Sequence, residues 1–77
     1  MPTVLRINGF RFFFYSNEND EPPHIHAENA ENTAKIWLSP IEIANSYGFS
    51  GKEINIIRKL VVENQELFIN TWNEYFS

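Results

Sequence analysis

The sequence predicts an α+β domain, in which a four-stranded antiparallel sheet of two hairpins is followed by a short and a long helix on one face. Residues 3–38 alternate between apolar and polar side chains, which is the period of half-buried strands. Two helix-capping motifs then begin segments with helical spacing. The chain of 77 residues suffices for one domain, with the sheet in 3–38 and the helices in 39–77.

The composition excludes several classes of protein. Hydrophobic residues make up 43% of the chain and aromatic residues 16%, which is too apolar for a disordered protein. The absence of cysteine excludes disulfides and thiolate metal sites. No segment has the pattern of a signal peptide or approaches the ~18 apolar residues of a membrane span. We therefore expect a soluble, cytoplasmic protein without a membrane partner. The net charge of −4 argues against non-specific nucleic-acid binding.

The first predicted hairpin is centred on Asn8-Gly9. This dipeptide favours a two-residue turn, because both turn positions need a positive φ. Such a turn places Arg6 opposite Arg11, and the alternation then separates two faces. The apolar face carries Leu5, Ile7, Phe10, Phe12 and Phe14. The other face carries Val4, Arg6, Arg11, Phe13 and Tyr15.

A second predicted hairpin follows a polar loop. Residues 17–23 are polar and end in two prolines, which is typical of a loop. Residues 24–29 and 33–38 then alternate with period two around a turn at 30–32. Their polar face carries His24, His26, Glu28, Lys35 and Trp37, and their apolar face carries Ile25, Ala27, Ala34, Ile36 and Leu38.

The remaining residues predict two helices. Ser39-Pro40 followed by Glu42 favours a short helix that ends at Gly48. Ser50 and Glu53 form a second capping motif, which begins a long helix up to residue 76. Its apolar stripes contain Ile54, Ile57, Val61, Phe68, Trp72 and Tyr75, and beside them Ile56, Leu60 and Leu67. We expect this wide apolar face to pack on the sheet and the short helix; the alternative is that part of it docks a partner.

The sheet face opposite the helices is the candidate site. Helices need the apolar sheet face, so the polar one is left for solvent or a partner. It holds both histidines and half of the six lysine and arginine residues. Its candidate binding residues are Arg6, Arg11, Tyr15, Lys35 and Trp37. Arg6 opposite Arg11 is a repulsive pair, which a bound anion would relieve and which Glu28 would also neutralise.

His24 and His26 admit three interpretations. Side chains two apart on a strand point the same way, with Cα atoms ~6.5–7 Å apart. The pair and Glu28 would supply three ligands to zinc. Without a metal, the histidines would act as acid and base of a small nuclease, with the cations on phosphate and Trp37 or Tyr15 stacking a base. In the third interpretation the imidazoles hold the proline loop through its carbonyls. Whether the chain is an enzyme stays open; we expect no cofactor, zinc being the alternative.

Several motifs are similar to the domain of unknown function 4160 family of small bacterial proteins. They are the R-I-x-G-F hairpin, E-P-P-H-I-H, A-K-x-W-L, Y-G-F-S, and the terminal N-x-E-L and W-x-E-Y-F. The resemblance runs nearly end to end, although the turn in "AENAENT" lacks the glycines often found there. The motif positions hold Arg6, Gly9, Glu21, Pro22, Pro23, His24, His26, Lys35, Gly48, Asn64 and Trp72.

The resemblance implies a setting rather than a chemistry, because the family has no agreed activity. It implies a two-gene, toxin–antitoxin-like system with a second small protein from a neighbouring gene. We therefore expect an interaction module that binds an acidic protein partner or RNA through the polar sheet face or the helix flank. The alternative is a small nuclease or metal-dependent hydrolase using His24 and His26. Self-association into a homo-oligomer also stays open.

Overall fold

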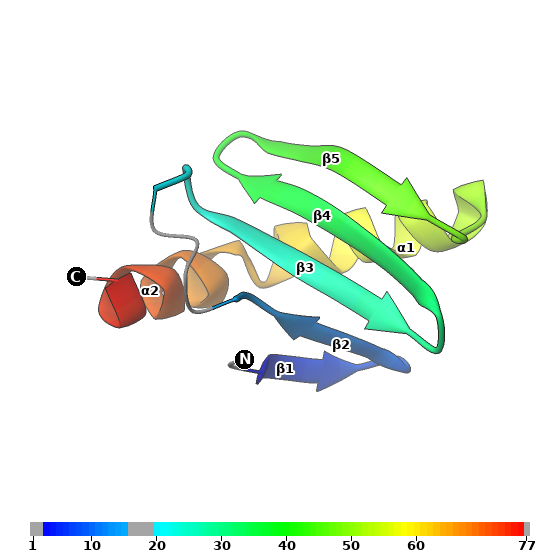
Figure 1. The fold of residues 1–77 in the computed structure, drawn as a ribbon, viewed down its shortest axis with the longest axis horizontal. Helices are drawn as coiled ribbons and strands as arrows, with labels where there is room; N and C mark the ends of the chain where they lie inside the picture. The colour runs from blue at the N-terminus through cyan, green and yellow to red at the C-terminus, as the bar shows by residue number, and fades with distance from the viewer. Residues whose placement is uncertain (1–2, 16–19, 77) are drawn as a thin grey trace.

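The structure is a computed structural model that describes residues 3–15 and 20–76. Five strands form one antiparallel sheet in chain order, and two helices follow. The elements are β1 (Thr3–Ile7), β2 (Phe10–Phe13), β3 (His24–Asn29), β4 (Asn32–Leu38), β5 (Ile41–Tyr47), α1 (Gly51–Glu63) and α2 (Gln65–Phe76). Figure 1 shows both helices behind one face of the sheet. The predicted α+β class is confirmed, whereas the predicted number of four strands is wrong.

The predicted first hairpin is confirmed. Asn8 and Gly9 both have positive φ, 53° and 82°, and the turn pairs Arg6 with Arg11. Of the predicted loop at 17–23, residues 17–19 lie outside the described residues. Its last residue joins the sheet, since the carbonyl of Pro23 accepts a hydrogen bond of 3.1 Å from the Leu38 amide.

The β3–β4 hairpin turns at Ala30 and Glu31, because Asn29 pairs with Asn32. Ala30 adopts φ 54°, a left-handed conformation that costs a residue with a side chain roughly 1–2 kcal/mol. This turn is the one whose sequence lacks a glycine. Alanine therefore adopts the left-handed conformation here, although glycine would adopt it more easily.

The predicted short helix at 39–48 is wrong, because β5 occupies this segment. Ser39-Pro40, joined by a cis peptide bond, forms a tight connection from β4, and Ile41 pairs with Leu38. Ile41 and Ile43 are half-buried and flank the exposed Glu42, which is the alternation of a strand. The capping motif at Ser39 thus leads to an edge strand.

The predicted start of the final helix is confirmed, but the prediction of one continuous helix is wrong. Ser50 and Glu53 form the predicted capping box, with Ser50 Oγ accepting from the Glu53 amide at 3.1 Å. The helix divides at Asn64, whose side chain donates to the Leu60 carbonyl at 2.8 Å. The Asn64 carbonyl accepts the Phe68 amide at 3.0 Å and so begins α2. The Leu60 carbonyl also accepts the Asn64 backbone amide at 3.1 Å, and the break lies at Asn64 itself, whose φ of −117° and ψ of 17° depart from helical values.

The apolar sheet face and the helices form one core. Its buried members include Phe12 and Ile36 from the sheet and Ile57, Phe68 and Trp72 from the helices. Among the second helical stripe, Leu60 is buried, while Ile56 and Leu67 are exposed. No helix in the described part of the chain is long and apolar enough to cross a membrane.

Replacing Gly48 should destabilise the domain. Gly48 has φ 90°, and a Cβ added there would overlap the side-chain amide of Asn32. We expect Gly48→Ala to lower the free energy of unfolding by about 2 kcal/mol or more, measured by urea denaturation. Gly51→Ala is the matched control, because nothing lies within 4 Å of a Cβ there. It should change stability by less than about 1 kcal/mol. Equal stability of the two variants would contradict this account.

Candidate functional site

The strand register gathers the candidate residues on one side of the sheet. Phe13 of β2 pairs with His26 of β3, and His26 in turn pairs with Lys35 of β4. Arg11 pairs with Glu28, and His24 with Trp37. We call this surface the polar sheet face and define it by Arg6, Arg11, Phe13, Tyr15, His24, His26, Glu28, Lys35 and Trp37. Except at His24, whose ring contacts Trp72 of α2, it lies opposite the face that packs on the helices.

Two of its cations are each held between a carboxylate and an aromatic ring. Arg11 donates to Glu28 Oε1 at 2.6 Å and lies 4.3 Å from the Phe13 ring centroid. Lys35 donates to Glu21 Oε1 at 2.6 Å and lies 4.5 Å from the Trp37 ring centroid. Each group restrains its neighbour, so the rings and cations of this face have defined positions.

Of the two paired arginines, Arg6 and Arg11, only Arg11 is neutralised by a carboxylate of the described residues. Glu28 balances Arg11, and Arg11 Nε also donates to Thr3 Oγ1 at 2.8 Å. Of the two ways to relieve the repulsion, pairing with Glu28 is therefore the one the structure uses for Arg11. Arg6 is exposed, and no hydrogen bond or ion pair joins its guanidinium to another residue in 3–15 or 20–76.

His24 is buried, with 0% of its surface exposed. Its Nδ1 lies 2.9 Å from the Pro22 carbonyl, which only accepts, so this contact assigns a proton to Nδ1. The ring centroid lies 4.8 Å from that of Trp72 and 5.5 Å from that of Trp37. The expectation that both imidazoles are open to solvent is thus wrong for His24. Its contacts are those of the third interpretation, in which the imidazole holds the proline loop.

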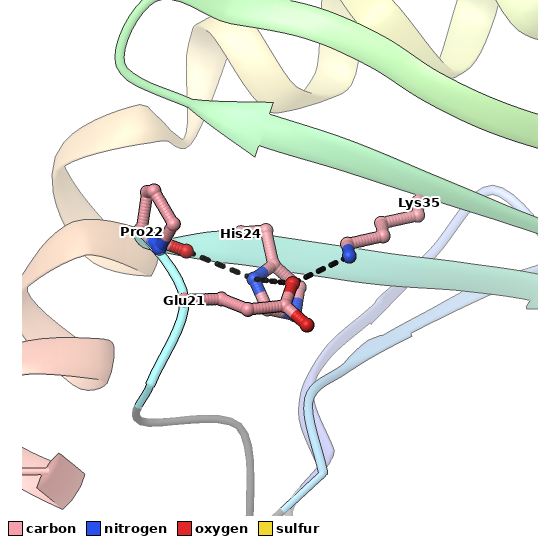
Figure 2. A network of polar contacts seen from close by, with 4 residues as sticks. All are labelled: Glu21, Pro22, His24 and Lys35. Atoms are coloured by element: carbon pink, nitrogen blue, oxygen red, sulfur yellow. Dashed lines mark hydrogen bonds and ion pairs between the residues drawn. The ribbon is translucent and has the colours of Figure 1, made fainter.

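A loop carboxylate lies close to both His24 and the sheet cation Lys35. Glu21 Oε1, already bonded to Lys35, lies 3.9 Å from His24 Nδ1. Figure 2 shows this carboxylate between the imidazole and the ammonium group. The contact ties residues 21 and 22 to strands β3 and β4. Sequence reasoning placed Glu21 on a family motif without giving it this role.

His26 has a different environment from His24. It is half-buried and stacks on Phe13 with 5.4 Å between ring centroids. The ring of Tyr15, which is 43% exposed, meets His26 edge-on at 4.9 Å. The ring centroids of the two histidines lie 5.2 Å apart, but only His26 is partly exposed at the surface. They therefore do not form a matched, accessible pair.

Among the residues suggested for zinc, the Glu28 carboxylate is engaged by Arg11. The contact of His24 Nδ1 with the Pro22 carbonyl leaves Nε2 as the ring atom that would bind a metal. In the described ranges no group of three histidine, aspartate or glutamate side chains is placed to hold a metal ion.

Truncation of the two histidines should separate their roles. His24→Ala removes a buried ring and its hydrogen bond to Pro22, so we expect the free energy of unfolding to fall by about 2–4 kcal/mol. His26→Ala removes a half-buried ring and should cost about 1 kcal/mol. Urea denaturation followed by tryptophan fluorescence measures both. A smaller loss for His24→Ala than for His26→Ala would contradict the structural role of His24.

Comparison with known proteins gives a family and nothing more specific. No curated protein and no solved structure matches the chain. A family model described as a domain of unknown function (DUF4160) matches residues 9–73, which include β2 to β5, the histidine motif, all of α1 and most of α2. The resemblance noted in the motifs is thereby confirmed, and the chain belongs to the DUF4160 family.

Proposed function

We propose that the chain is an interaction module that binds an acidic segment of a protein partner through its polar sheet face. In this proposal it is one component of a two-gene, toxin–antitoxin-like system, and the partner comes from the neighbouring gene. The observation that carries the proposal is the arrangement of the sheet. The helices pack on one face, and the other bears cations and aromatic rings held in fixed positions.

The accessible groups of this face are of the kinds found at binding hot spots. Tyr15 is exposed, and Trp37 is half-buried beneath Lys35. Protein interfaces are enriched in tyrosine, tryptophan and arginine. Rings that are already restrained lose little conformational entropy when a partner covers them. The polar sheet face therefore suits protein recognition.

The charge distribution favours a protein segment over RNA. Arg11 and Lys35 already have carboxylate partners, so Arg6 is the cation of this face without an ion pair among the described residues. RNA binding depends on several cations that neutralise phosphates. A protein segment with one or two acidic side chains requires fewer. The nuclease alternative has less support, because His24 is buried and catalysis by the pair needs two accessible imidazoles.

Co-purification with the product of the neighbouring gene tests the proposal. The wild-type chain should retain that protein through size-exclusion chromatography at low salt. Arg6→Glu and Tyr15→Ala should each lower the recovered partner at least about tenfold, because both residues are exposed on the polar sheet face. The fold should persist, since neither side chain belongs to the core.

Lys59→Glu provides the charge-matched control. Lys59 is an exposed cation on α1, away from the polar sheet face. It should leave the recovery unchanged. Equal recovery with Arg6→Glu and wild type would contradict the proposal, as would an equal loss with Lys59→Glu. If RNA is recovered in place of the protein and its recovery depends on Arg6, the partner is RNA and the proposed protein partner is wrong.

A further inference from the structure

A pocket of about 410 Å³ opens where the β1–β2 and β3–β4 turns lie next to each other. Figure 1 shows both turns at the same end of the sheet. Its lining comes from β1, β2, β3 and the turn residues Asn8, Gly9 and Ala30. Volumes of this order are typical of sites for small ligands.

The charges that line this pocket do not cancel. Arg6, Arg11 and Glu28 all contribute to the lining, which leaves one net positive charge. Arg11 is bonded to Glu28 and Thr3 and lies over Phe13, so two of its donors are already engaged. Arg6 remains exposed, with its donors unused by the described residues. The pocket can therefore accept one negative charge at Arg6.

The remaining lining suits a carboxylate at the end of a short apolar stem. Asn8 and Asn29 supply side-chain amides, whose NH₂ groups donate hydrogen bonds. The amide of Asn29 lies beside Gly9, where its Nδ2 is 3.4 Å from the position a Cβ would take. Ile7, 36% exposed, adds an apolar surface. Glu28 would repel a second negative charge, which disfavours a phosphate dianion.

We infer that this pocket binds a single carboxylate, that of an acidic side chain in the partner. The guanidinium of Arg6 forms the charge-assisted hydrogen bonds with it. This inference rests on the proposed function, because it names the group of the partner that the chain recognises. It makes Arg6 the residue that distinguishes acidic partners from neutral ones.

Titration of the isolated protein with small probes tests the pocket directly. N-acetylglutamate α-amide carries one side-chain carboxylate, N-acetylglutamine α-amide carries none, and N-acetylalanine carries only a terminal carboxylate. In nuclear magnetic resonance spectra at low salt, the glutamate probe should shift the Gly9 backbone and Asn29 side-chain amides with saturation. The glutamine probe should give no saturable shift. Stronger binding of N-acetylalanine would assign the pocket to a chain terminus instead and overturn the side-chain inference.

Two variants test whether binding of the glutamate probe depends on Arg6. Arg6→Gln should weaken binding of the glutamate probe about tenfold, since it removes the charged donor. Lys59→Gln, which removes an equal charge on α1, should leave the affinity unchanged. Undiminished binding by Arg6→Gln would overturn the inference, as would equal binding of the glutamate and glutamine probes.

The two proposals fail in different ways. If the glutamate probe does not bind but Arg6→Glu still reduces co-purification, the pocket is not the recognition point and the proposed function stands. If the probe binds in an Arg6-dependent manner but no partner co-purifies, the pocket stands and the partner assignment is wrong.

Discussion

The register of β3 between β2 and β4 is the constraint on which the rest of the structure depends. A shift of one residue would turn every side chain of a strand to the opposite face. The Ala30-Glu31 turn fixes the pairing of β3 with β4, and the Asn8-Gly9 turn fixes that of β1 with β2. The same register buries Ile25 beneath the helices and aligns His26 with Phe13. The core and the polar sheet face are thus two consequences of one pairing, and neither can change alone.

The proline–histidine motif has a structural explanation that requires no chemistry. Pro22 supplies the carbonyl that His24 binds, and Pro23 supplies the carbonyl that receives the Leu38 amide. Proline has a fixed φ, so both carbonyls are offered with little loss of backbone entropy. Glu21 then secures the same loop to Lys35. The motif therefore joins the loop to both β3 and β4, and it explains why a histidine is buried at the start of a strand.

Features set by neighbouring residues could be predicted from the sequence, whereas those set by distant contacts could not. The Asn8-Gly9 turn and the Ser50 capping box are local, and both are confirmed. The segment at 41–47 was predicted as a helix from the Ser39 cap, a local signal, and pairing with β4 makes it a strand instead. The burial of His24 depends on Trp72 of α2, which no strand pattern reveals. The alternation of side chains along the strands predicted the polar sheet face. The contact of Lys35 with Glu21 could not be predicted in this way, because it depends on how the loop before β3 folds back.

The different environments of the two histidines change how the polar sheet face should be probed. His24 contacts Trp72, so its substitution disturbs the joint between sheet and α2 and would impair any function of the domain. Arg11 and Lys35 are also poor probes, because each holds a carboxylate and a ring in place. Arg6 and Tyr15 are exposed and outside the core. Loss of binding on changing Arg6 therefore reports recognition itself. Tyr15 also packs against the rings of Phe13 and His26, so the stability of a Tyr15 variant has to be measured alongside its binding.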